Sequence, residues 1–247
     1  FSTRCDPYGN PLPGSTASMC YMPENYDHVY RGPMSLRDAL AQSVNVPAVK
    51  MLYLVGLDSA IDMAQRLGIT SLKDKARYGL TLVLGGGEVS LLEMTSAYGV
   101  FANDGKRNPY AGILKIEDTQ GQTVYEYAQH ETQVIDPNIA RSISDVLSDN
   151  TARAPAFGEN SFLKVADREV AVKTGTTNDY RDAWIVGYTP SLVVGAWAGN
   201  NDNSPMQKKV AGFIIAPLWN AFFNSASTTM LTEHFPPPPQ VPKDLKP

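Results

Sequence analysis

The pentapeptide Lys173–Thr177, Lys-Thr-Gly-Thr-Thr, gathers several groups that bind anions at the end of an apolar stretch, residues 170–172. Because side chains alternate along a strand, Lys173 and Gly175 are expected on one face, and Thr174 and Thr176 on the other. The glycine leaves room for a second backbone, and an open strand edge can pair with an extended peptide. The string predicts a binding site for a peptide carboxylate. A solvated strand end is the alternative interpretation of the tripeptide alone.

A second polar group lies between two predicted helices, at Ser43-Val44-Asn45. The spacing places Ser43 and Asn45 on one turn, where both side chains could face a single cavity. Asn45 could instead act only as the cap of the helix that follows, because asparagine is favoured at that position. Taken alone, the tripeptide does not decide between these interpretations.

The elements that must position these groups change character along the chain. Ser35 and Asp38 predict a helix start, and Ser90 with Glu93 a second one. A hairpin is expected over residues 113–127. The further expected helices cover residues 47–56, 58–67, 136–147 and 210–224, and the expected strands cover 170–175, 183–188 and 192–199. Only three residues separate the last two strands, so they should be antiparallel. Helices followed by an antiparallel sheet predict an α+β fold.

The composition narrows the function classes. A net charge of -4 in 247 residues, without a basic stripe, argues against a nucleic-acid partner. The three histidines lie too far apart to predict a metal site, and no apolar run approaches the length of a membrane span. The chain opens with Phe1 rather than methionine, which reads as a fragment of something longer. Cys5 and Cys20 could form a disulfide or remain free thiols, and the sequence leaves both open.

In combination, the two polar strings occur in the order of a known signature. Ser-x-Asn precedes Lys-Thr-Gly by 130 residues, as in penicillin-binding proteins and serine β-lactamases. The surrounding strings resemble the transpeptidase domain of class A (bifunctional) penicillin-binding proteins over roughly residues 24 to 220. They are Tyr26-Asp27, Tyr30-Arg31-Gly32-Pro33, Leu36-Arg37, residues 43–49, residues 173–179, Asp182-Ala183-Trp184, residues 186–190 and residues 197–200.

This resemblance implies a fold and a reaction. The fold would be that of penicillin-binding transpeptidases and serine β-lactamases, an antiparallel sheet flanked by helices with a helical subdomain, here incomplete at the N-terminus. The reaction would cross-link peptidoglycan: a serine attacks the D-Ala–D-Ala bond of a stem peptide and passes the acyl group to a second amine. β-Lactam antibiotics would acylate the same serine, and no metal or organic cofactor is implied.

The roles that the resemblance implies fall on residues of both strings. Ser43 would relay a proton to the leaving amine, and Asn45 would bind the substrate's peptide group. The backbone N–H of Thr176 would form half of an oxyanion hole. The catalytic residues implied are Ser43, Asn45, Lys173 and Thr176, and the substrate-binding residues are Lys173, Thr174, Gly175, Thr176 and Thr177.

The chain departs from the family in one respect, because no Ser-x-x-Lys precedes Ser43. The string Ser161–Lys164 has that spelling but lies too late in the chain, in an expected loop. Ser148-Asp149-Asn150 resembles the β-lactamase form of the second motif, but is expected at a helix C-terminus. We therefore expect the nucleophile outside this chain, and an inactive fragment.

The expected organisation follows. Residues 1–33 would be an irregular connection within the transpeptidase domain, residues 34–225 its body, and residues 226–247 a proline-rich linker. Within the body, residues from about 34 to 150 would be helical, and residues from about 165 to 225 would form the sheet and the closing helix. The parent would carry a membrane anchor and a glycosyltransferase domain, at the extracytoplasmic face of the bacterial membrane. A DD-carboxypeptidase or β-lactamase on the same fold, or a non-catalytic wall-binding protein, remain alternatives.

Overall fold

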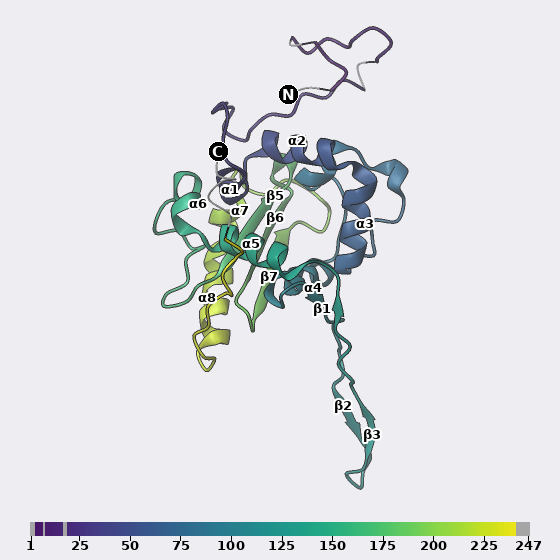
Figure 1. Ribbon diagram of the computed structural model, residues 1–247, viewed down its shortest axis with the longest axis vertical. Coiled ribbons are helices and arrows are strands. Elements are labelled where there is room, and N and C mark those ends of the chain that lie inside the picture. Colours follow the sequence, from purple (N-terminus) through teal and green to yellow (C-terminus); the bar gives the residue numbers. More distant parts are fainter. Residues whose placement is uncertain (1–2, 7, 17–18, 241–247) are drawn as a thin grey trace.

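A computed structural model describes residues 3–6, 8–16 and 19–240 of the chain. A three-stranded antiparallel sheet in the order β5-β6-β7 lies at its centre (Figure 1). The strands are β5 (Ala171–Thr176), β6 (Asp182–Tyr188) and β7 (Val193–Gly199). The predicted strands and their antiparallel pairing are confirmed, with Lys173 opposite Val186 and Trp184 opposite Trp197 in the register.

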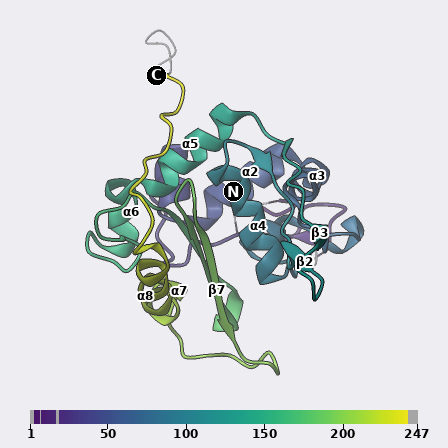
Figure 2. The same ribbon diagram turned by 90° about the horizontal axis from the view of Figure 1, so that it is seen from below.

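Helices cover both faces of this sheet (Figure 2). One face carries α7 (Ala211–Ile214) and α8 (Ala216–Ser227), and the other α4 (Leu91–Ala102) and α5 (Pro137–Ser148). Alternation along the strands supplies both layers, since Val172 and Ile185 pack toward α8 while Ala171 and Tyr188 pack toward α5.

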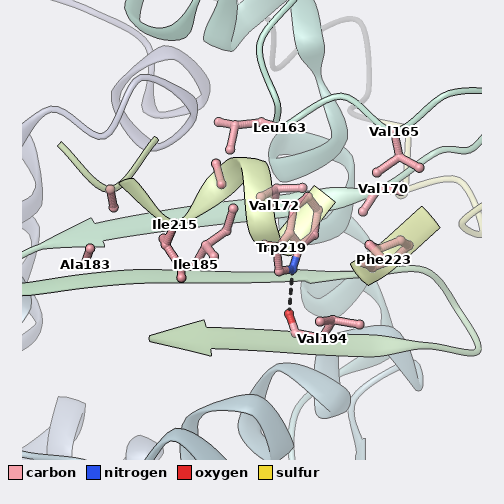
Figure 3. Close-up of a cluster of buried hydrophobic side chains, with 12 residues drawn as sticks. Leu163, Val165, Val170, Val172, Ala183, Ile185, Val194, Ile215, Trp219 and Phe223 are labelled. Carbon is pink, nitrogen blue, oxygen red and sulfur yellow. Dashed lines mark hydrogen bonds between the residues drawn. The ribbon is translucent and has the colours of Figure 1, made fainter. Parts of the chain in front are cut away.

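The main core lies under α8 (Figure 3). Trp219 is fully buried there, and its indole N–H donates to the Val194 carbonyl over 2.9 Å. Gly187 makes room for the indole, because a Cβ at this position would lie 2.3 Å from Trp219 Cζ2. Trp219 and Gly187 therefore hold α8 closely against the sheet.

The N-terminal helices form a separate cluster beside the sheet. They are α1 (Leu36–Ala41), α2 (Asn45–Val55) and α3 (Leu57–Leu67), followed by the 3-10 turns η2 (Lys75–Arg77) and η3 (Leu80–Leu84). Ser35 caps α1 as predicted, accepting from the Asp38 N–H at 3.0 Å. The helix predicted from residue 47 begins two residues earlier, at Asn45, so the Ser-x-Asn string reaches into its first turn.

One further prediction needs correction. The single helix expected over 210–224 is divided into α7 and α8 at Ile215, where Pro217, which has no N–H, starts a new first turn. The helix start predicted from Ser90 and Glu93 is confirmed, because the Ser90 hydroxyl accepts from the Glu93 N–H at 3.1 Å and the Glu93 carboxylate accepts from the Ser90 N–H. The same carboxylate also accepts from the Thr70 hydroxyl and N–H, at 2.5 and 3.1 Å.

The remaining elements lie at the periphery. The hairpin expected over 113–127 is present and projects away from the body (Figure 1). Its strands are β2 (Lys115–Glu117) and β3 (Thr123–Glu126), and between the hairpin and the body β1 (Lys106–Arg107) pairs with β4 (Thr132–Gln133). The last elements are α6 (Asn150–Phe157) and the turn η4 (Asn178–Tyr180).

The N-terminal segment is closed on itself, and part of the C-terminal segment packs on the body. The structure joins Cys5 and Cys20 by a disulfide, with the Cα atoms 5.0 Å apart. Part of the segment predicted as a linker packs on the body, where the Phe235 ring lies 5.5 Å from that of Tyr188. Residues 241–247 of that segment, and Phe1 at the other end, lie outside the described residues.

Candidate active site

β5 forms an edge of the sheet, because within the described ranges it pairs with no strand but β6. The Thr177 N–H donates to the Asp182 carbonyl at 3.2 Å, which marks this as a hydrogen-bonded pair. In an antiparallel ladder such pairs alternate, so the N–H and C=O groups of Thr174 and Thr176 point away from β6. The outer edge of β5 thus offers main-chain donors and acceptors to an extended ligand.

Ser43 lies in the turn between α1 and α2. The helix ends because Gln42 and Ser43 close it with hydrogen bonds to Asp38 and Leu40, and the Val44 N–H then returns to the Ala39 carbonyl at 2.9 Å. Ser43 takes a left-handed conformation, with φ of 57°. Such a conformation is uncommon for a residue with a side chain, and it is found preferentially at functional sites.

The two strings meet in space. Lys173 Nζ lies 2.6 Å from Ser43 Oγ and 2.7 Å from the Thr174 carbonyl oxygen. Burial lowers the pKa of Lys173 from 10.5 to about 8. Transfer of an ammonium away from water disfavours its charged form. The turn that holds Ser43 therefore faces the Lys-Thr-Gly strand.

A groove of about 450 Å³ opens beside this contact. Ser43, Asn45 and Lys173 supply its polar groups. The rest of its wall is apolar and comes mainly from α1, α2 and η3, with one residue each from the turn before α2 and from α3: Leu36, Ala39, Leu40, Val44, Pro47, Ala48, Met51, Leu52, Val55, Ala60, Val83 and Leu84. A concave apolar surface with a few convergent polar groups is the usual form of a binding site.

The wall formed by α1 is held from behind. Arg37 forms ion pairs with Asp145 and with Asp149, the latter at 3.0 Å, and the Gln42 side chain donates to the Ala152 carbonyl at 3.2 Å. Hydrogen bonding to Asp145 is the main reason why the pKa of Arg37 is raised. These contacts fix the end of α1, and with it the position of Ser43.

Asn45 is the first residue of α2 and lines the groove, but its side chain forms no hydrogen bond with Ser43 or Lys173. Its side-chain amide donates to the Glu24 carbonyl at 3.1 Å. Nor does Asn45 cap α2, since the residue at the cap position is Val44. The interpretation of Asn45 as merely a cap is therefore wrong, while its role toward a substrate stays a prediction.

The threonines of the strand differ in their partners. The Thr176 hydroxyl accepts from the Ala211 N–H at 3.0 Å, which leaves its own hydrogen free to donate. Thr177 Oγ1 and Asp182 are joined by two bonds of 2.9 Å. Thr174 is half-buried on the edge. At Gly175 an added Cβ would meet the Trp184 Cβ at 3.4 Å, an ordinary contact, so the sheet itself does not demand a glycine.

The strings Ser148-Asp149-Asn150 and Ser161–Lys164, which resemble motifs of the family, do not line the groove. Ser148 ends α5 and Asp149 caps α6, as expected for a helix terminus. Ser161–Lys164 lies in the loop before β5. Across residues 3–6, 8–16 and 19–240, no group of three acidic, histidine or cysteine side chains could hold a metal ion, and no helix is long and apolar enough to cross a membrane.

Two further residues hold the site in place and were not predicted. Asn25 accepts from the Val46 N–H at 3.0 Å, and Asp182 receives both Thr177 and the Trp197 indole N–H, the latter at 2.9 Å. A capping pattern could not reveal Asn25, because 21 residues separate it from the helix that it contacts. Asp182 lies in one of the strings that carry the family resemblance, but the residue types around it do not indicate its hydrogen-bond partners.

Comparison with known proteins decides the family. The sequence profile of the penicillin binding protein transpeptidase domain matches residues 14–220. This chain belongs to the penicillin-binding protein transpeptidase family. Penicillin-binding protein 1A of Aquifex aeolicus is 34% identical over 247 residues, covering 97% of this chain and 32% of that protein. Penicillin-binding protein 1B of Vibrio cholerae is 32% identical, covering 78% of this chain and 24% of that protein.

Solved structures agree with the fold. PonA1 of Mycobacterium tuberculosis in complex with penicillin V superposes with a TM-score of 0.79 at 24% identity, over 88% of this chain and 63% of that one. Penicillin-binding protein 1A of Haemophilus influenzae gives 0.75 at 24% identity, over 96% and 40%. The predicted penicillin-binding transpeptidase fold and its α+β class are confirmed. The chain spans about a third of the length of the curated relatives.

Proposed function

We propose that this chain contributes one wall of the active site of a peptidoglycan DD-transpeptidase. The observation that carries the proposal is the Lys173–Ser43 contact at 2.6 Å, beside a groove that both residues line. An extended stem peptide pairs with the outward N–H and C=O groups of Thr174 and Thr176. Lys173 and the threonine hydroxyls attract its terminal carboxylate.

In this proposal, the nucleophilic serine and its lysine belong to a Ser-x-x-Lys segment outside the 247 residues. The serine oxygen forms an ester bond with the penultimate D-Ala carbonyl, and the amide C–N bond breaks. The serine proton passes through the lysine of that segment and Ser43 to the leaving D-Ala amine. The amine of a second stem peptide then attacks the ester, forms the cross-link and frees the serine.

The groove supports this division of the site. Its apolar wall of α1, α2 and η3 is exposed beside Ser43 and Lys173, as a surface for a helix would be. The Thr176 N–H, directed to the open edge, supplies one donor to the oxyanion, and the N–H of the nucleophile supplies the second. Losing one donor of this kind typically lowers the rate by roughly 10²- to 10³-fold.

The same proposal extends to the parent protein. It would carry a membrane anchor and a glycosyltransferase domain and act at the extracytoplasmic face of the bacterial cell membrane, with peptidoglycan stem peptides and β-lactam antibiotics as its ligands. The support for these statements is the similarity to penicillin-binding proteins 1A and 1B.

A fluorescent penicillin tests the proposal. The full-length protein should become covalently labelled at one serine upstream of residue 1, whereas the 247-residue chain should remain unlabelled. Peptide mapping by mass spectrometry identifies the serine. Label on a serine of this chain, or no label on the full-length protein, contradicts the proposal. With a stem-peptide substrate, cross-linked dimers indicate the transpeptidase, and release of D-Ala alone indicates a carboxypeptidase.

A further inference from the structure

Asn25 is one of the few polar side chains buried in this domain, with 6% of its surface exposed. Both ends of its amide are engaged. Its oxygen accepts from the Val46 N–H at 3.0 Å, and its NH₂ group donates to the Val29 carbonyl at 2.8 Å. The His28 N–H closes a turn onto the Asn25 carbonyl at 3.0 Å. The side chain is therefore held rigidly by its own turn while it reaches α2.

The first turn of α2 needs such an acceptor. The N–H groups at a helix N-terminus have no partner within the helix. Val44, at the cap position, has no side-chain oxygen to offer, and Pro47 has no N–H. Asn25 therefore performs the task that a serine or aspartate at position 44 would otherwise perform.

A second bond between the same segments runs in the opposite direction. The Asn45 amide donates to the Glu24 carbonyl at 3.1 Å, next to the bond that Asn25 accepts from Val46. Residues 24–25 and 45–46 thus hold each other through one donor and one acceptor each. Since Asn45 and Pro47 line the groove, these two hydrogen bonds lie next to the groove's polar residues.

We propose that Asn25 is a positioning residue of the active site, which caps α2 from 21 residues upstream and so fixes the Ser43–Asn45 turn opposite Lys173. This inference rests on the proposed function for its kinetic consequence. Misplacement of a reacting group by about 1 Å can lower a rate roughly 10²-fold. A loosened α2 start moves Ser43 and Asn45 but leaves Lys173 and the threonines that attract the ligand's carboxylate in place, so the acylation step suffers more than the initial binding.

The test uses the full-length protein with Asn25→Ala, Asn25→Asp and a control, Asp136→Ala. Aspartate keeps an acceptor for the Val46 N–H, whereas alanine removes it. Asp136 caps α5 by accepting from the Asn138 N–H at 2.8 Å, away from the groove. Asp136→Ala therefore removes a helix cap without disturbing the Ser43–Asn45 turn. Stopped-flow labelling with a fluorescent penicillin separates the acylation rate constant from the affinity of the initial complex.

We expect Asn25→Ala to lower the acylation rate constant roughly 10- to 100-fold with little change in initial affinity. Asn25→Asp should restore most of the rate, and Asp136→Ala should acylate like the wild type. An unchanged rate in Asn25→Ala, an equal loss in both Asn25 variants, or a matching loss in Asp136→Ala overturns the proposal.

Hydrogen exchange of the peptide spanning residues 43–52 separates this inference from the proposed function. Its protection should fall in Asn25→Ala and persist in Asn25→Asp and Asp136→Ala. If wild-type protein fails to react with penicillin, the proposed function fails, and the exchange pattern alone decides whether Asn25 positions the turn. Unchanged protection in Asn25→Ala then refutes it.

Discussion

Lys173 Nζ and Ser43 Oγ lie 2.6 Å apart, although 130 residues separate them in the chain. A charged lysine can only donate, so Ser43 must accept this bond with a lone pair. The hydroxyl hydrogen of Ser43 remains free to point into the groove. This hydrogen is the one that Ser43 would donate in the proposed relay, in which the lysine of the upstream Ser-x-x-Lys segment supplies its replacement.

Replacement of Ser43 by alanine tests this relay. In the full-length protein, Ser43→Ala should lower the rate of acylation by penicillin roughly 10²-fold, because a positioned proton-transfer group typically contributes at least that much. Fluorescent penicillin labelling over time measures the rate. Ser59→Ala, at an exposed position of α3, serves as the control and should acylate normally. Wild-type kinetics in Ser43→Ala exclude Ser43 from proton transfer.

The pKa of Lys173 predicts how stability depends on pH. Its value in the folded protein, about 8, lies below the ordinary 10.5, so the unfolded chain binds more protons between about pH 8 and 10.5. In that window, stability rises with pH. The penalty of charging Lys173 is present in full below pH 8 and vanishes above 10.5.

Lys173→Met removes the contribution of Lys173 to the pH dependence of stability, so comparison with the wild type measures that contribution. The stability advantage of the variant over the wild type should shrink by about 2 kcal/mol between pH 7.5 and 9.5. Urea unfolding at both pH values measures it, with the exposed Lys50→Met as control. A constant difference between wild type and Lys173→Met across this range contradicts a lowered pKa.

Thr176 provides a test of the strand end. Thr176→Val leaves the Ala211 N–H, which donates to the threonine hydroxyl at 3.0 Å, without its acceptor. An unpaired N–H of this kind destabilises a protein by about 1–2 kcal/mol, whereas Thr176→Ser keeps the acceptor and should be near neutral. Urea denaturation compares the two variants. Equal stabilities for valine and serine show that the bond does not hold α7 to β5.

Gly187 tests the packing beneath the site. A Cβ in Gly187→Ala would collide with the Trp219 indole at 2.3 Å and should destabilise the protein by about 1–3 kcal/mol. The control is Gly79→Ala, since a Cβ at Gly79 meets nothing within 4 Å. Thermal unfolding followed by tryptophan fluorescence measures both. If Gly187→Ala is as stable as Gly79→Ala, the indole is not the reason for the glycine.

The local signals in the sequence predicted the elements well. Ser35 and Asp136 mark the starts of α1 and α5, and strand alternation fixed the faces of β5. These are short-range effects, because a cap or a strand face depends on residues only two or three positions apart. Remote partners were not predicted, as for Glu93, whose carboxylate also binds Thr70, 23 residues away in the chain.

The amino-acid sequence by itself determined the family, the order of the two polar strings and the antiparallel pairing of the strands. Only the tertiary structure decided that Ser43 Oγ reaches Lys173, that Asn45 turns to Glu24, and that Asn25 caps a helix 21 residues away. The physical reason is that hydrogen bonds act over about 3 Å. Which donor lies within that range of which acceptor is fixed by how α1, α2 and β5 pack, and residue types and spacing along the chain do not specify that packing.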